Sequence, residues 1–160
     1  MSLLGMIAGL NRGRVNFVVI GGLAARAHGS TRITEDLDVC YDREKGNVRR
    51  VARVLARWRA YPRGIERGLP FVMDERTLAA APVMTLTSDE GDIDVFDTVP
   101  GVGGYAEALS SSLAIDAGDV AFRVLDLPAL IAAKRAAGRR RDLDHLPELE
   151  ALLEVWGRRS

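Results

Sequence analysis

The spacing of apolar residues in the first part of the chain alternates between helical and strand periods. Apolar positions three and four residues apart predict a helix over residues 2–10. A nearly continuous apolar run predicts a strand over residues 15–20 that is buried on both faces. An alanine-rich stretch predicts a short helix over residues 23–28, and an alternation of apolar and polar positions predicts a second strand over residues 33–41.

The rest of the chain continues to mix the two periods. Apolar residues on one side and arginines on the other predict an amphipathic helix over residues 47–58. The turn sequences Ser88-Asp89-Glu90-Gly91 and Gly118-Asp119 each predict a hairpin. The remaining expected elements are a loop over 62–70, a short helix within 71–81, strands over 83–87 and 92–98, a helix over 105–109, strands over 113–117 and 121–125, and helices over 127–137 and 143–156.

Proline sets the expected start of the last helix. Pro147 lacks a backbone N–H and is tolerated only near a helix start, so we expect this helix to begin close to Asp144. The two hairpins rule out a strictly repeating parallel unit. The pattern therefore predicts an α+β fold, with a mixed β-sheet flanked by helices and with helices at the C-terminus. The length predicts a single domain over residues 1–160, in which residues 126–160 form a C-terminal helical part.

Composition and charge narrow the setting of the protein. Basic and acidic residues balance at 22 each, so no overall field predicts binding to nucleic acid or to a membrane. No apolar run approaches the roughly 20 residues of a membrane span. Cys40, the single cysteine, cannot form an internal disulfide and suits a reducing compartment. Because no basic leader precedes the apolar part of Met1–Leu10, we expect a cytoplasmic protein.

Paired aspartates are the first candidates for chemistry. Asp36 and Asp38 lie two residues apart on a predicted strand, so their carboxylates point to the same face. Asp94, with Asp92 in reserve, repeats this alternation on a later strand, and the acids converge if the two strands are neighbours. Clustered carboxylates raise one another's pKa and are costly without a cation, which predicts a site for Mg²⁺ or Mn²⁺ and two-metal phosphoryl transfer. Solvated acids at a sheet edge would explain Asp36 and Asp38 equally well.

Two further features suit a nucleotide. Gly21-Gly22 lies between the first strand and the next helix, where backbone N–H groups can bind a phosphate, although a tight turn without a ligand is the alternative. Lys134 lies on the apolar face of the helix over 127–137. Its ammonium either extends to solvent or binds a triphosphate tail.

The remaining polar candidates are open to two interpretations. Arg32 either braces a carboxylate or contacts phosphate, and Thr34 shares the carboxylate face by alternation. The basic turn Arg139-Arg140-Arg141 is either solvated or contacts phosphate or RNA. We interpret His28 as a partly buried structural histidine and His145 as isolated, so no zinc site is expected.

Together these residues resemble the polymerase-β-like nucleotidyltransferase superfamily, and more closely the minimal bacterial nucleotidyltransferases of the AbiEii toxin type. That group shows a G-G-x-A…H-G-x-x-R-x-T-x-D-hydrophobic-D pattern, followed later by a leucine-rich helix, a lysine and a G-R-x-x-D turn. This chain matches the pattern at Gly21, Gly22, Ala24, His28, Gly29, Arg32, Thr34, Asp36, Asp38, Leu130, Lys134, Gly138, Arg139 and Asp142. The resemblance runs from about residue 16 to residue 150; Gly22 stands where the superfamily often has serine.

The resemblance implies an activity and a set of roles. Asp36, Asp38 and Asp94 would bind Mg²⁺ or Mn²⁺, and Asp94 would also help to deprotonate an acceptor hydroxyl. Gly21, Gly22, Arg32, Thr34 and Lys134 would bind a nucleoside triphosphate such as ATP, from which a nucleoside monophosphate is transferred.

The resemblance leaves the acceptor and the partners open. The acceptor would be tRNA, a protein hydroxyl or a small molecule such as an antibiotic, and a toxin-like protein would have an antitoxin partner. The alternative is a non-catalytic module that retains the fold and binds a nucleotide or a partner protein. The clustered acids argue against that alternative, because their mutual repulsion is costly when they bind nothing.

Overall fold

The computed structural model describes residues 2–159; Met1 and Ser160, which the expected domain includes, lie outside them. The helices are α1 (Leu3–Arg12), α2 (Gly21–Ala27), α3 (Lys45–Arg57), α4 (Glu75–Ala79), α5 (Tyr105–Ser110), α6 (Leu127–Ala137) and α7 (Arg140–Arg159). The strands are β1 (Phe17–Ile20), β2 (Leu37–Tyr41), β3 (Tyr61–Pro62), β4 (Val83–Thr87), β5 (Ile93–Phe96), β6 (Thr98–Val99), β7 (Gly103–Gly104), β8 (Ser112–Ala117) and β9 (Val120–Leu125).

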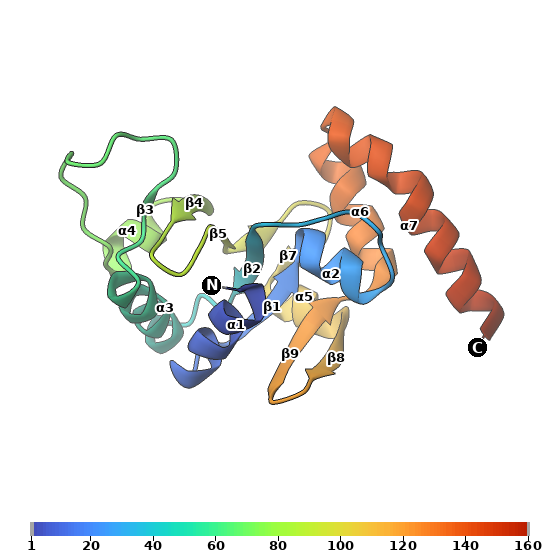
Figure 1. Ribbon diagram of the computed structural model, residues 1–160, viewed down its shortest axis with the longest axis horizontal. Coiled ribbons are helices and arrows are strands. Elements are labelled where there is room, and N and C mark those ends of the chain that lie inside the picture. The colour runs from blue at the N-terminus through green and yellow to red at the C-terminus, as the bar shows by residue number, and fades with distance from the viewer. Residues whose placement is uncertain (1, 160) are drawn as a thin grey trace.

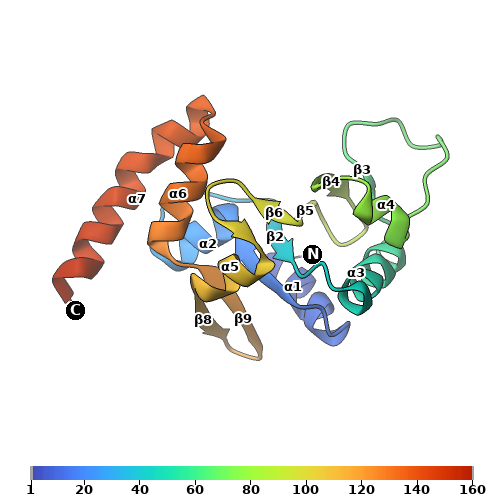
Figure 2. The same cartoon turned by 180° about the vertical axis from the view of Figure 1, so that it is seen from behind.

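Seven of these strands form one mixed sheet. Their order is β3-β4-β5-β2-β1-β9-β8, while β6 and β7 form a separate two-stranded sheet. The β2–β5 and β1–β9 pairs are parallel and the other pairs are antiparallel. Helices α3 and α4 lie beyond one end of the sheet, and α6 and α7 lie at the opposite end (Figure 1; Figure 2 shows the same arrangement from behind). This is the predicted mixed sheet flanked by helices, with two helices at the C-terminus.

The core lies at the centre of this sheet. All four residues of β1 are buried, which confirms the prediction from its continuous apolar run. Leu37 of β2 and Ile93 of β5 are fully buried beside it, and Leu55 of α3 and Leu130 of α6 are buried in the same cluster. Close packing of this kind holds the central strands rigidly, so side chains at their ends are placed with little freedom.

The second strand is shorter than expected. It begins at Leu37, where the Leu37 amide donates to the carbonyl of Asp92 at 3.0 Å, and residues 30–36 have no strand structure. The expectation of a strand from residue 33 is wrong because this segment is held by α7 instead of by a neighbouring strand. Both Ser30 and Thr31 donate hydrogen bonds to the carboxylate of Glu148.

The last helix begins earlier than expected. Gly138, at φ +65°, ends α6 in the left-handed conformation, and α7 starts at Arg140, so Pro147 lies inside the helix. Our expectation of a start near Asp144 is therefore wrong. Pro147 removes the bond to the carbonyl of Leu143, and Leu143 is half exposed, which leaves that position open to water. Packing of α7 against α6 keeps the helix continuous despite this loss.

None of the helices in residues 2–159 is both long enough and apolar enough to span a bilayer. Cys40 is fully buried on β2, and burial raises the pKa of its thiol to about 12. The thiol therefore stays protonated and behaves as a small apolar side chain.

Candidate active site

One register row across the sheet brings the predicted acids together. Asp38 of β2 pairs with Asp94 of β5, and the row continues to Ile20 of β1 and Thr85 of β4. Residues that pair directly on neighbouring strands share a face, so the two carboxylates stand side by side. Asp36 lies immediately before β2 rather than on it, so the expectation that it shares a strand with Asp38 is wrong. The expectation that β5 lies next to β2 is confirmed.

A cavity of about 680 Å³ opens over this row. Its wall includes all eight predicted site residues: Gly21, Gly22, Arg32, Thr34, Asp36, Asp38, Asp94 and Lys134. Asp92 is not part of the wall, and its side chain is 39% exposed against 17% for Asp94. The geometry therefore favours Asp94 over Asp92 as the third carboxylate, although the roles of these residues stay predictions.

Asp38 carries the strongest electrostatic strain of this cluster. Burial, followed by repulsion from Asp94 and then Asp36, raises its pKa to about 7, while Lys134 acts in the opposite direction. An ionised Asp38 next to two further carboxylates is unfavourable in a low-dielectric site unless positive charge is supplied. The cluster is consequently poised to attract a cation.

Neighbouring side chains leave no room for a Cβ atom at Gly21 or Gly22. Gly21 has φ +68°, and a Cβ at this position would lie 2.1 Å from Oδ2 of Asp38. A Cβ on Gly22 would lie 2.7 Å from Oγ1 of Thr34, so a serine at this position would also collide with Thr34. The tight turn therefore has a structural cause that needs no ligand, and phosphate binding by Gly21-Gly22 stays a prediction.

Lys134 faces the cavity with a partner of its own. Its Nζ lies 3.2 Å from Oδ1 of Asp142, whose other oxygen lies 2.7 Å from Nε of Arg139. Asp142 is 1% exposed; burial acts to raise its pKa, but hydrogen bonds from Arg139 and Lys134 outweigh this and lower it. Lys134 thus does not extend into solvent, and Asp142 holds two cations on the wall of the cavity.

Arg32 and Thr34 form local contacts. Nη1 of Arg32 donates to the carbonyl of Arg141 at 3.3 Å, and the Thr34 hydroxyl donates to the carbonyl of Asp36 at 3.1 Å. These contacts do not support the interpretation that Arg32 braces a carboxylate. Its guanidinium instead lies at the cavity wall beside the α6–α7 turn.

Arg63 is a site residue that the sequence patterns did not reveal. Nη2 of Arg63 lies 2.7 Å from Oδ1 of Asp94, Nη1 lies 3.8 Å from Asp36, and Nε lies 3.4 Å from Asp92. The residue follows the short strand β3, inside the segment expected to be a loop, and its backbone N–H donates to Thr85 at 2.9 Å. An arginine in a loop gives no periodic signal, so sequence reasoning had no means to place it here.

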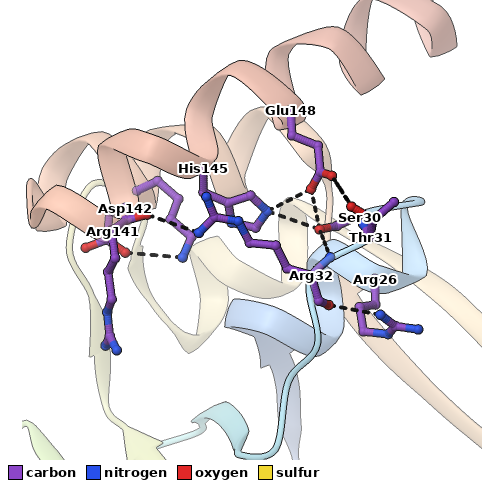
Figure 3. Close-up of polar contacts among 9 residues, drawn as sticks. Arg26, Ser30, Thr31, Arg32, Arg141, Asp142, His145 and Glu148 are labelled. Carbon is purple, nitrogen blue, oxygen red and sulfur yellow. Dashed lines mark hydrogen bonds and ion pairs between the residues drawn. The ribbon is translucent and has the colours of Figure 1, made fainter.

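A polar network joins α7 to the segment that precedes Asp36 (Figure 3). Glu148 accepts hydrogen bonds from the hydroxyl of Ser30 and from the hydroxyl of Thr31, the latter at 2.8 Å. Nε2 of His145 lies 3.1 Å from both the Ser30 hydroxyl and Glu148. The interpretation of His145 as isolated is wrong, because its side chain is buried in this network.

These three side chains are not a hydrolase triad. In such a triad the serine and the acid contact opposite nitrogens of the imidazole, whereas Ser30 and Glu148 both contact Nε2 of His145. Ser30 is also only 6% exposed. The network is a tether that holds the segment carrying Arg32 against α7. His28 has the predicted structural role, since its buried Nε2 lies 2.7 Å from the carbonyl of Leu125.

The tether gives a testable pH dependence. Hydrogen bonds from Ser30 and then Thr31 lower the pKa of Glu148 to about 2. A lowered pKa means that the stabilisation is present above the ordinary pKa of 4.5 and is lost as the pH falls towards 2. Glu148→Gln is expected to lower the free energy of unfolding by about 1–2 kcal/mol at pH 7 and to flatten its decline between pH 5 and pH 3. Urea denaturation across this range measures both effects.

Glu150→Gln is the matched control for this variant. Glu150 lies on the same helix but pairs with Arg135 and has no contact with residues 30–32. Its replacement should leave the decline at low pH as in the unchanged protein. Equal stability of Glu148→Gln and the unchanged protein at pH 7 would show that the tether contributes nothing.

Comparisons with known proteins address the fold. No protein-family model and no curated protein sequence matches this chain. Among solved structures, it is similar to the crystal structure of a protein from Thermotoga maritima that is named a "putative nucleotidyltransferase". The TM-score is 0.60 at 14% sequence identity, and the match covers 91% of this chain and 88% of the other. The chain thus has a nucleotidyltransferase fold; at this identity the likeness concerns the fold alone.

Proposed function

We propose that the protein is a nucleotidyltransferase that uses Mg²⁺ or Mn²⁺ to transfer a nucleoside monophosphate from a triphosphate such as ATP to an acceptor hydroxyl. The observation that carries this proposal is the pairing of Asp38 with Asp94 at the floor of a cavity whose wall also holds Asp36 and Lys134. Carboxylates on one side and cations on the other match a metal-bound triphosphate. The fold supports the same reaction class.

The donor set fits a hard divalent cation. Three carboxylates supply oxygen ligands, and burial together with repulsion from Asp94 and Asp36 raises the pKa of Asp38. Within residues 2–159, no group of three or more acids, histidines or cysteines is placed so that it could hold a metal ion without movement of side chains. The guanidinium of Arg63 contacts Asp36 and Asp94 instead, which shows that this position accepts positive charge.

The residues of the cavity would have different roles in the proposed reaction. Asp36, Asp38 and Asp94 would hold the metal, which when bound neutralises phosphate charge and lowers the pKa of the acceptor hydroxyl. Lys134 and Arg139, oriented by Asp142, would bind the phosphate tail. The acceptor oxygen bonds to the α-phosphorus, the bond from that phosphorus to the bridging oxygen breaks, pyrophosphate leaves, and Asp94 takes the hydroxyl proton. Positioning and charge compensation account for most of the acceleration.

We propose tRNA as the first acceptor to test. Arg140 and Arg141 are exposed beside the cavity, where they suit contacts with an RNA backbone. The AbiEii-type resemblance supports a macromolecular acceptor and an antitoxin partner. A protein hydroxyl and a small molecule such as an antibiotic are the other acceptors to be tested in parallel.

The test combines turnover with a matched pair of variants on α6. The protein is incubated with Mg²⁺, each of the four labelled nucleoside triphosphates, and tRNA, cell extract or antibiotics, and label transfer and pyrophosphate are measured. Lys134→Ala is expected to reduce kcat/KM about 100-fold, because it removes a cation from the cavity wall. Arg135→Ala should change it less than twofold, since Arg135 pairs with Glu150 outside the cavity.

One result would overturn the proposed transfer. It is the absence of label transfer and of pyrophosphate release with all four triphosphates and all acceptors. Nucleotide binding without turnover would instead support the non-catalytic module that retains the fold.

A further inference from the structure

Arg63 contacts acids from two separate segments of the site. Asp94 lies on β5, Asp92 lies immediately before β5, and Asp36 lies before β2. All three have an oxygen within 3.8 Å of the same guanidinium. Nη2 of Arg63 additionally donates to the carbonyl of Leu86 on β4 at 2.7 Å.

The guanidinium fits this position imperfectly. Nη2 makes a short hydrogen bond to Asp94, but the buried Nε has no hydrogen-bond partner even though Asp92 lies 3.4 Å away. An arginine in a site shaped for its side chain would have a hydrogen-bond acceptor for each buried N–H group, because a buried unpaired donor costs about 1–3 kcal/mol. The contacts with Asp92 and Asp36 are therefore ones of charge rather than of hydrogen-bond geometry.

The chain around Arg63 permits a different position of this side chain. Gly64 follows Arg63 at φ +82°. A Cβ added to Gly64 would meet no atom within 4 Å, so there is open space beside the chain at that point. The side chain is 30% exposed, whereas the backbone N–H is held on β4. Movement of the guanidinium consequently needs side-chain rotation only and leaves the sheet intact.

We propose that Arg63 is an internal counter-ion that neutralises the carboxylate cluster in the metal-free protein. A divalent cation must displace the Arg63 guanidinium in order to bind these carboxylates. This inference rests on the proposed function, in which Asp36 and Asp94 are metal ligands. A cation and a guanidinium cannot both occupy the same carboxylate oxygens, so each weakens binding of the other. The free protein therefore binds the cation weakly, and a nucleotide bound with the metal offers its phosphates to the released guanidinium.

The test measures Mn²⁺ binding to the nucleotide-free protein, by calorimetry and by the electron paramagnetic resonance signal of free Mn²⁺. Arg63→Gln is expected to bind Mn²⁺ about tenfold more tightly than the unchanged protein, because the competing charge is gone. Arg63→Lys keeps the charge but loses the forked geometry, so an increase of about two- to threefold is expected. A non-hydrolysable nucleoside triphosphate should reduce the difference between Arg63→Gln and the unchanged protein.

Two controls locate the effect. Arg67 lies on the same loop, 5.6 Å from the ring centre of Tyr61 and away from the acids, so Arg67→Gln should leave Mn²⁺ affinity unchanged. Adding Asp38→Asn to Arg63→Gln should abolish the gain if the cation binds at the cluster. Circular dichroism confirms that each variant is folded, and Arg63→Lys serves as the test if Arg63→Gln is not.

The outcomes separate this inference from the proposed function. Unchanged or weaker Mn²⁺ binding by folded Arg63→Gln, in a protein that transfers nucleotides, overturns the counter-ion role alone. Tighter binding by this variant supports the role even if the unchanged protein consumes no nucleotide, in which case the transfer reaction is wrong. Failure of both proteins to bind Mn²⁺ overturns the counter-ion role, and the transfer assay decides the proposed function separately.

Discussion

Asp38→Asn is expected to abolish nucleotidyl transfer and, at the same time, to stabilise the metal-free protein at pH 8. The Asp38 carboxylate is buried beside Asp94, and burial and repulsion raise its pKa to about 7. Above that pH the folded state must hold an unfavourable charge that the amide lacks. We expect the free energy of unfolding to rise by about 1–3 kcal/mol in the variant. Loss of activity with a gain of stability is typical of residues kept for function.

The pH dependence of this effect has a definite sign. A raised pKa in the folded state means that Asp38 favours folding at low pH, and that this contribution is lost as the pH rises through about 7. Urea denaturation of the metal-free protein should therefore show the difference between Asp38→Asn and the unchanged protein at pH 8 and little difference at pH 4. Addition of Mg²⁺ should stabilise the unchanged protein and leave the variant unaffected.

Asp119→Asn supplies the control for this experiment. Asp119 is exposed in the turn between β8 and β9, away from the cavity, so its replacement should alter neither stability nor activity. A folded Asp38→Asn protein that is less stable than the unchanged protein at pH 8 would contradict the electrostatic account. It would show that Asp38 serves the fold.

Gly21→Ala is expected to destabilise the protein by about 3 kcal/mol and to eliminate activity. The new Cβ would lie 2.1 Å from Oδ2 of Asp38, in a backbone conformation, φ +68°, that side chains rarely adopt. Either the turn or Asp38 must move, and both changes displace a carboxylate of the cluster. Thermal and urea denaturation measure the stability, and the transfer assay measures the activity.

Gly118→Ala isolates the contribution of the backbone. Gly118 has φ +70°, but a Cβ added there would meet nothing within 4 Å, so its replacement should cost only about 1 kcal/mol. Asp38→Ala should recover part of the stability lost in Gly21→Ala, because it removes the oxygen that the new methyl group meets. A double-mutant cycle without coupling between positions 21 and 38 would contradict the steric argument.

Much of the site could be predicted from neighbours in the sequence. The alternation through Asp36 and Asp38, and again through Asp94, is a strand property that depends on residues two apart. The structure places Asp38 and Asp94 on adjacent strands, Asp36 immediately before β2, and Lys134 on the same cavity. The start of β2 could not be predicted in this way. Hydrogen bonds to Glu148 determine the conformation of the segment before Leu37, and its alternation of apolar and polar residues does not.

Arg63 and Glu148 show where local patterns have no information. Arg63 contacts Asp94, about 30 positions away in the chain, and Glu148 contacts Ser30, about 118 positions away. Neither Arg63 nor Glu148 lies in a periodic pattern that predicts its partner. Pro147 was misleading for a related reason. Its cost to α7 is a local quantity, but the packing of α7 on α6 outweighs it and is a property of the folded protein.

The amino-acid sequence therefore specifies the kinds of elements in this protein and the acids that its central strands carry, because hydrophobic periodicity acts over a few residues. The three-dimensional fold alone specifies which groups compensate these acids. Asp94 comes beside Asp38 through the register of β5 on β2, Arg63 reaches both segments of acids from β3, and Asp142 directs Lys134 to the cavity. Such contacts join distant residues, and their energies depend on burial and distance, which no local pattern contains.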